Sequence, residues 1–255
     1  MSIYFDNAAT SPLRKEVIES INEVLLETYG NPSSNHSFGR KAKTLIENSR
    51  KIIASELNAS PQEIIFTSGG TESDNMLLRS AVEDLDVKTI ISTKIEHHAI
   101  LHALDYLEKK NISIVYLPVD KNGEFKYKDL ENALSFDDSK KLVSLMHVNN
   151  EIGNMIDLEY VSKICQSKGV LLHTDAVQSI GHYKIDLTKI KVDFLSAAAH
   201  KFHGPKGVGF SYIRKNSGLN PFILGGSQER GLRAGTESVH NIVGMSKALE
   251  LAYKN

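Results

Sequence analysis

Chemistry at a carbonyl group is suggested by Lys201, a lysine set among small residues. It follows the run Ser196-Ala-Ala-Ala-His200 and precedes the turn Gly204-Pro-Lys-Gly207. Small neighbours leave room for a ligand, and a lysine in a desolvated pocket has a lowered pKa and reacts as a nucleophile with an aldehyde. Because most lysines are solvated surface groups, Lys201 alone indicates little.

Two other groups each follow an apolar run. Thr67-Ser-Gly-Gly-Thr71 places two glycines before an expected helix start, whose free amide groups attract an anion such as phosphate. Asp175 ends a second apolar run, with Gln178 three residues later, and its carboxylate could face a cationic ring nitrogen. A glycine turn is also common in α/β proteins, and Asp is a favoured helix cap.

Taken together, the three groups match the requirements of one cofactor, pyridoxal phosphate. It needs a lysine for its aldehyde, a carboxylate for its ring nitrogen and an anion site for its phosphate. The conjunction is far more specific than any of its members.

The histidines 97, 98 and 102 raise the alternative of a metal site. His98 and His102 are one helical turn apart, as in zinc-binding pairs. The spacing suggests no third ligand, and the metalloprotease glutamate between the histidines is missing. We therefore expect no metal, and His97, at a strand end, is the better candidate for a site.

A mostly parallel sheet would bring these groups to one edge. Helical periodicity, as in 98–109 and 158–168, separates most of the short apolar runs. We expect a three-layer α/β fold with helices on both faces, and such sheets bind ligands beyond the carboxyl ends of their strands. The predicted strands are Ile64–Phe66, Thr89–Ser92, Ile112–Leu117, Leu142–Met146, Val170–His173 and Phe194–Leu195.

The composition is that of a folded globular protein. Of the 255 residues, 41% are hydrophobic and 24% are charged. The net charge of -1 provides no positive field for nucleic acid, and no apolar stretch approaches the length of a membrane span. The start of the chain lacks the pattern of a secretory signal, so we expect a cytoplasmic protein. The single cysteine, Cys165, excludes an internal disulfide.

The order of the motifs resembles the class V branch of the fold-type I pyridoxal phosphate enzymes. Within that branch it is similar to the cysteine desulfurases, which supply sulfur for iron-sulfur clusters. The resemblance extends from Tyr4 to the last residue. It is carried by Tyr4–Thr10, Gly30–Ser34, Phe66–Asn75, Met146–Gly153, Asp175–Gln178, His200 and Lys201 with Gly204–Gly207, and Glu229–Thr236.

This resemblance implies a role for each residue that would contact the cofactor ring. Lys201 would hold pyridoxal phosphate as a Schiff base, and Asp175 would pair with the pyridine nitrogen. His97 would stack on the ring and shuttle protons. Asn150 and Gln178 would hydrogen-bond the phenolic oxygen of the ring.

The resemblance likewise implies a phosphate site and a homodimer. Gly70, Thr71, His200 and Thr236 would bind the phosphate, with Thr236 coming from the second subunit. At Ala198, close relatives often carry a serine that adds a hydroxyl to this site. Losing one such hydrogen bond costs about 0.5 to 1.5 kcal/mol, so we expect weaker but persisting cofactor binding.

Family members continue past the position of Asn255 into a smaller domain. In the family, residues equivalent to 1–15 pack with that domain, and 16–255 would form the large, cofactor-binding domain. The missing part carries an arginine for the substrate carboxylate and the cysteine whose thiolate attacks the sulfur of L-cysteine. Cys165 falls in a predicted helix and is expected to be structural.

The family reaction converts L-cysteine to alanine and an enzyme persulfide, which passes to a sulfur-acceptor or scaffold protein. We expect this chain to be incomplete for that reaction. A related class V enzyme, such as a selenocysteine lyase or an aminotransferase, and a non-catalytic interaction module are the alternatives. The stretches Met146–Gly153 and Gly30–Ser34 favour the desulfurase.

Overall fold

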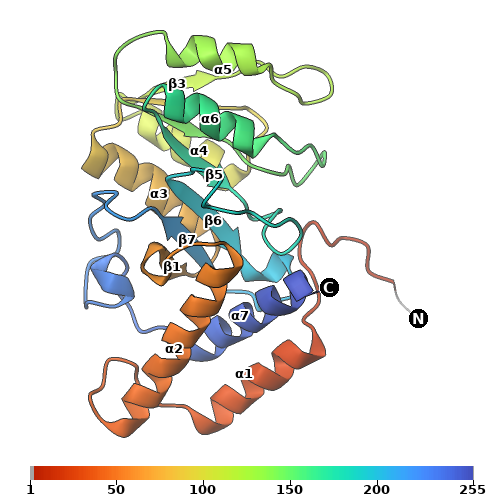
Figure 1. Ribbon diagram of the computed structural model, residues 1–255, viewed down its shortest axis with the longest axis vertical. Coiled ribbons are helices and arrows are strands. Elements are labelled where there is room, and N and C mark those ends of the chain that lie inside the picture. The colour runs from red at the N-terminus through yellow and green to blue at the C-terminus, as the bar shows by residue number, and fades with distance from the viewer. Residues whose placement is uncertain (1–2, 255) are drawn as a thin grey trace.

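One seven-stranded sheet organises the computed structural model, which describes residues 3–254; residues 1, 2 and 255 lie outside the described part. The strand order is β1-β7-β6-β5-β4-β2-β3 (Figure 1). Strand β7 runs antiparallel to both β1 and β6, and the other neighbours are parallel. The strands are β1 (Ile64–Thr67), β2 (Thr89–Ser92), β3 (Ser113–Tyr116), β4 (Lys141–Ser144), β5 (Leu171–Asp175), β6 (Phe194–Ala198) and β7 (Gly209–Ile213).

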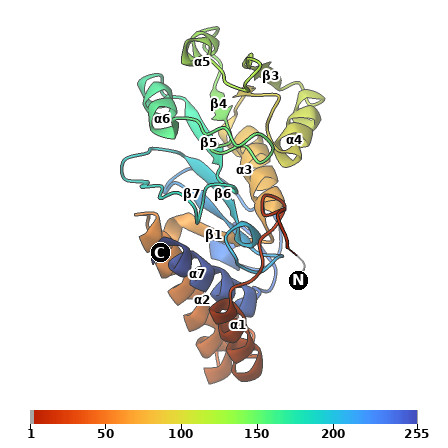
Figure 2. The ribbon, with the colours of Figure 1, turned by 90° about the vertical axis from the view of Figure 1, so that its right-hand side faces the viewer.

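Helices cover both faces of the sheet, which confirms the predicted three-layer α/β fold. Helices α3 and α4 pack on one face, and α6 covers the other (Figure 2). Among residues 3–254, no helix is both long and apolar enough to cross a membrane. The helices are α1 (Lys15–Glu27), α2 (Ser37–Glu56), α3 (Gly70–Leu85), α4 (His98–Glu108), α5 (Tyr127–Leu134), α6 (Leu158–Ser167) and α7 (Val239–Lys254), with short 3₁₀ turns η1 (Pro61–Glu63), η2 (Ala199–Lys201) and η3 (Glu229–Gly231).

The predicted strands all form, because short apolar runs bounded by turn residues suit a sheet covered on both faces. Every residue of β1, β2, β4, β6 and β7 is buried, whereas β3, at the sheet edge, is partly exposed. Helix α6 begins as its sequence indicates, with the Asp157 carboxylate accepting the Tyr160 N–H at 2.9 Å. Strand β7 was not predicted.

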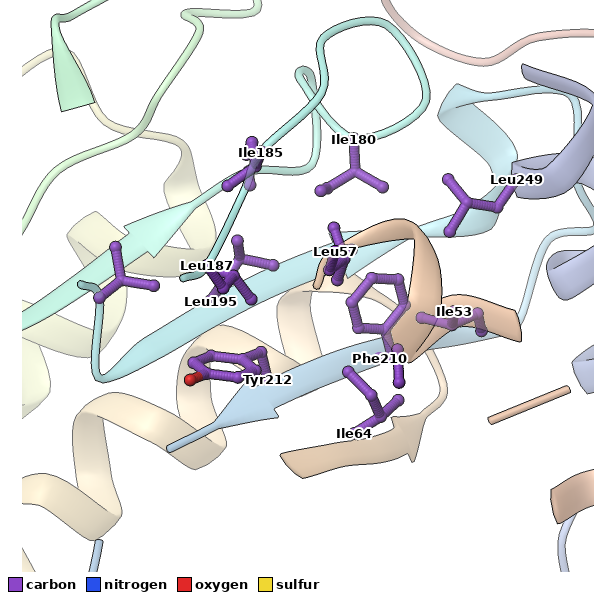
Figure 3. Packing of buried hydrophobic residues seen from close by; sticks show 14 of the residues in the cluster. Ile53, Leu57, Ile64, Ile180, Ile185, Leu187, Leu195, Phe210, Tyr212 and Leu249 are labelled. Carbon is purple, nitrogen blue, oxygen red and sulfur yellow. The ribbon is translucent and has the colours of Figure 1, made fainter. Parts of the chain in front are cut away.

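The lower part of the molecule is a bundle of α1, α2 and α7 that packs beneath β1, β7 and β6 (Figure 1). Ile53 and Leu57 of α2 point toward Phe210 and Tyr212 of β7 (Figure 3). Gly244 lets α7 approach α1 closely, since an added Cβ there would lie 2.7 Å from Ile21. The bundle thus supports the sheet edge that carries β1.

The N-terminal segment crosses the start of η2 before α1 begins. Ser11 donates its N–H and its hydroxyl to the carbonyl of His200, both at 2.8 Å. The Ser11 hydroxyl also accepts the N–H of His203 at 2.7 Å. Residues separated by nearly 190 positions in the sequence are therefore adjacent beside Lys201.

Ile53→Ala tests the packing of α2 against the sheet. Because Ile53 is fully buried, its truncation should lower the free energy of unfolding by about 2 to 5 kcal/mol. Ile18→Ala on α1 is the matched control; Ile18 is 42% exposed and should change stability by no more than about 0.5 kcal/mol. Urea denaturation followed by circular dichroism measures both, and equal effects would contradict the described core.

Candidate active site

A cavity of about 430 Å³ opens at the carboxyl ends of the parallel strands. Eight of the nine residues predicted for a cofactor site line it, and Thr236 does not. The parallel strands end at a common edge, so segments far apart in the chain converge there. The eight residues are Gly70, Thr71, His97, Asn150, Asp175, Gln178, His200 and Lys201.

Lys201 ends η2, directly after the buried strand β6. Its Nζ donates to the carbonyl of Ala8 and, at 3.0 Å, to that of Ala9. Burial lowers the pKa of Lys201, while the carboxylates of Asp175 and Asp6 oppose that shift. The amine is thus nearer to its neutral, nucleophilic form than a surface lysine would be.

Asp175 lies at the end of β5 with a nearly inaccessible carboxylate. It is 4% exposed, and its Oδ1 accepts the N–H of Val177 at 2.9 Å. Burial, with a smaller contribution from the neighbouring carboxylate of Asp74, raises the pKa of Asp175 to about 7. A cation in the cavity would therefore be attracted to this end of the site.

Asp74 of α3 is a second buried carboxylate in the cavity, and the sequence analysis missed it. It is 1% exposed, and its Oδ1 has no hydrogen-bond partner among the described residues. Burial raises its pKa to about 7. The sequence of Thr71–Asn75 predicts a helix start and belongs to the stretch Phe66–Asn75 that carries the family resemblance, but nothing in its spacing indicates that Asp74 points into the cavity.

His173 lies beneath the two carboxylates in a network that joins three strands. Its Nδ1 is 2.9 Å from the Ser144 hydroxyl of β4, and its Nε2 is 3.2 Å from the Ser196 hydroxyl of β6. The same Nε2 is 3.5 Å from Asp74 Oδ1. Because burial lowers the pKa of His173 to about 4, the ring is neutral at pH 7 and does not neutralise the carboxylates.

The start of α3 also lines the cavity, and the backbone approaches closely there. Gly69 has φ of +153°, a conformation that residues with a Cβ rarely adopt. A Cβ on Gly70 would lie 2.6 Å from the Val177 side chain. The first amides of α3 lack partners within the helix, so Gly70 and Thr71 offer an anion site.

The other side chains in the cavity are held by local hydrogen bonds. His97 is the N-cap of α4, and its Nδ1 accepts the N–H of Ala99 at 3.1 Å. The amide of Gln178 donates to Ala8 at 2.9 Å, and that of Asn150 to Glu151 at 2.6 Å.

His200 completes the polar lining near Lys201. Its Nδ1 is 3.2 Å from the Thr10 hydroxyl, so the N-terminal segment also contacts this part of the site. Burial and the positive charges of Lys201 and Lys206 lower the pKa of His200. Ala198, the departure noted in the sequence, lines the same cavity.

Thr236 lies in a different place from the other predicted residues. It lines a separate cavity together with Thr28, Tyr29 and Gly30, which follow α1. Within one chain, therefore, the structure does not bring Thr236 to Lys201.

Cys165 lies on α6, remote from the cavity lining, and is 1% exposed. Burial raises the pKa of its thiol to about 12, so it is protonated and buried, as expected for a structural thiol. Within 3–254, no cluster of three or more His, Cys, Asp or Glu side chains is arranged to hold a metal ion.

The residues present fit pyridoxal phosphate. Asp175 and Asp74, whose Oδ1 lacks a hydrogen-bond partner among the described residues, suit a protonated ring nitrogen, the start of α3 suits a phosphate, and Lys201 suits an aldehyde. These groups line one cavity, so a single molecule could contact all of them.

Comparison with known proteins agrees with this geometry. The family model described as aminotransferase class-V matches residues 3–255. The chain belongs to the class V aminotransferase family. Proteins of this family, including the cysteine desulfurases, use pyridoxal phosphate.

Curated relatives and solved structures of this family resemble the chain closely. It is 50% identical to the cysteine desulfurase IscS of Dictyoglomus turgidum over 98% of this chain and 64% of the relative. Identity to the cysteine desulfurase IscS of Methanosarcina thermophila is 46%, over 98% of this chain and 62% of the relative. A solved NifS-like protein superposes with a TM-score of 0.96 at 44% identity, over 100% of this chain and 70% of that one. The chain thus spans about 64% of the first relative's length.

Asp175→Asn tests the buried carboxylate in the cofactor-free protein. The pKa of Asp175 is about 7 in the folded state and about 4 in the unfolded state. The stability that its neutral carboxyl group contributes is therefore fully present below about pH 4 and is lost as the pH rises to 7. The Asn variant should therefore gain stability relative to the parent between about pH 4 and pH 7, and the difference should level off above that. Denaturation midpoints across this pH range measure the difference.

Asp186→Asn is the control for this titration. Asp186 is partly exposed and hydrogen-bonded to Thr188, which lowers its pKa, so its contribution changes below about pH 4. Its stability difference from the parent should be constant in the tested range. A constant difference for Asp175→Asn as well would show that Asp175 ionises normally.

Proposed function

We propose that this chain is the cofactor-binding region of a cysteine desulfurase, which removes sulfur from L-cysteine to give alanine and a persulfide for iron-sulfur cluster assembly. The observation that carries the proposal is the shared cavity, which holds the Lys201 amine, the buried Asp175 carboxylate and the start of α3. Relatives at 45 to 50% identity that are named cysteine desulfurases favour this activity over a selenocysteine lyase or another class V reaction.

Lys201, Asp175 and His97 would perform the central steps. The Lys201 amine, with its lowered pKa, would hold the cofactor through its aldehyde and would move a proton to or from the substrate carbon. Asp175 would hold the ring nitrogen in its protonated form. His97 would stack on the ring and shuttle a proton. When bound, pyridoxal phosphate supplies the electron sink that stabilises negative charge on the substrate.

Asn150 and Gln178 orient the ring through its phenolic oxygen. The phosphate is bound by Gly70 and Thr71 at the start of α3 and by His200. A further hydroxyl, that of Thr236, comes from the second subunit of a homodimer. The position of Thr236 outside the Lys201 cavity of its own chain supports this role in the partner's site.

The attacking thiol is not Cys165, because that thiol is buried, protonated and remote from the Lys201 cavity. We propose that the thiol, and the arginine for the substrate carboxylate, lie outside these 255 residues in a smaller domain. Residues 1–15 would pack with that domain, and 16–255 would form the large domain. The exposed aromatic side chains of Tyr4 and Phe5 support a packing role for the first segment.

Lys201→Ala tests the covalent link to the cofactor. Adding pyridoxal phosphate to the parent protein should produce an absorbance band near the visible edge, and Lys201→Ala should abolish it, since Lys201 is the one lysine among the described residues that line the cavity. The control is Lys206→Ala, an exposed lysine in the following turn, which should keep the band. A band that persists in Lys201→Ala contradicts the proposal.

Cys165→Ala tests whether the sole cysteine takes part in turnover. The cofactor-loaded parent and the variant are incubated with L-cysteine, and alanine and sulfide are quantified. We expect equal rates for the two proteins, because the Cys165 thiol is protonated and inaccessible. Alanine release that disappears only in the variant would make Cys165 the nucleophile and refute the assignment above.

A further inference from the structure

A buried ion pair holds the loop that precedes Thr236. The Glu229 carboxylate accepts Arg50 Nη1 at 2.7 Å, Arg50 Nη2 at 2.9 Å and the Phe66 N–H at 2.7 Å. Arg50 Nη1 also donates to the Ile64 carbonyl at 2.7 Å. The two side chains are only 3% and 2% exposed. We call this set of contacts the Arg50–Glu229 clamp.

The clamp takes the place of a neighbouring strand. Strand β1 is at the end of the sheet order, so its outer N–H and C=O groups have no ladder partner. The side chains of Glu229 and Arg50 satisfy one of each, at Phe66 and Ile64. Buried backbone groups need hydrogen-bond partners, and Glu229 supplies one to β1. The loop is therefore attached to β1 by a hydrogen bond as well as by packing.

The loop backbone at Glu229 and Arg230 adopts a left-handed conformation that is unfavourable for residues with a Cβ, and the clamp holds it there. Glu229 and Arg230 have φ values of 44° and 59°, and Gly231 follows with 81°. Two consecutive residues with a Cβ in the left-handed region are uncommon, because the Cβ approaches the backbone. Such a shape persists where surrounding contacts overdetermine it.

A second ion pair holds the following part of the loop. Arg233 donates to the two carboxylate oxygens of Glu72 at 2.7 and 3.1 Å. Gly235 donates its N–H to the Gln228 side chain at 3.3 Å. The backbone is therefore anchored on both sides of Gly231 and up to the residue before Thr236.

We propose that the Arg50–Glu229 clamp is a positioning device that presents Thr236 to the cofactor phosphate bound in a second copy of this chain. The inference rests on the proposed function, in which Thr236 serves the partner's site. Lys201 and Thr71 share a cavity, and Thr236 lies outside it. The clamp of one chain therefore acts on the site of its partner, whereas Lys201 and Thr71 act in their own chain.

Subunit mixing tests this assignment with cofactor binding as the readout. In homodimers, Glu229→Gln should weaken the affinity for pyridoxal phosphate about tenfold, because Gln keeps the size of the side chain but loses the charge that pairs with Arg50. The variant is then mixed with Lys201→Ala under conditions of subunit exchange. In each mixed dimer, one site combines Lys201 of the Glu229→Gln chain with Thr236 held by the intact clamp of the Lys201→Ala chain. Parental affinity should return at that one site.

Two control variants calibrate the readout. Thr236→Ala removes the presented hydroxyl and should be rescued by Lys201→Ala in the same way. Thr71→Ala alters a residue that shares the cavity with Lys201, so mixing should not rescue it. The inference requires that mixing with Lys201→Ala rescues Glu229→Gln, as it rescues Thr236→Ala. If mixing fails to rescue Glu229→Gln, as it fails for Thr71→Ala, the clamp acts only within its own chain and the inference is wrong.

Gly231→Ala provides the same test without altering the buried ion pair, should Glu229→Gln fail to fold. In Glu229→Gln, Arg50 keeps the Glu47 carboxylate, 3.1 Å from its Nε, as an ion-pair partner. A Cβ at Gly231 meets no atom within 4 Å, but φ of 81° strains an alanine and should shift the loop. Rescue of its weakened cofactor affinity by Lys201→Ala supports the inference, and parental affinity in the unmixed variant contradicts it. A parental protein that shows no absorbance band refutes the proposed function instead, and one that binds cofactor as a monomer refutes only the clamp.

Discussion

Two carboxylates buried at one edge of the sheet impose the constraint on which the site depends. Removing a carboxylate from water is costly, and the pKa values of Asp175 and Asp74 rise to about 7 as a result. The neutral His173 beside them offers hydrogen-bonding groups but no positive charge. A protonated ring nitrogen would offset this desolvation cost. The buried carboxylates therefore favour a cationic ligand over a neutral one.

The surrounding fold keeps these groups from separating. Asp175 and His173 are consecutive inward-facing residues of β5, and His173 contacts serines on both neighbouring strands. Asp74 is supplied by α3, which packs on one face of the same sheet. Because several strands and helix α3 contribute side chains, the site could not form from one local segment of the chain.

The ends of the described chain are also tied to the site. Carbonyls of Ala8 and Ala9 accept the Lys201 amine, and the Ser11 backbone pairs with His200. Elsewhere, Glu229 accepts the N–H of Phe66 and so attaches its loop to edge strand β1. The two arrangements place segments from near the beginning and the end of the chain beside the strands that carry the cofactor-binding groups.

Local sequence indicated six of the seven strands and most of the candidate residues. Short apolar runs ending in glycine or polar residues indicated the six predicted strands, and eight of nine predicted site residues line one cavity. Tertiary structure alone decided the antiparallel β7, the inward direction of Asp74, the carbonyls opposite Lys201 and the separation of Thr236 from that cavity. These features depend on contacts between residues far apart in the chain, whereas periodicity and spacing report only on neighbours along it.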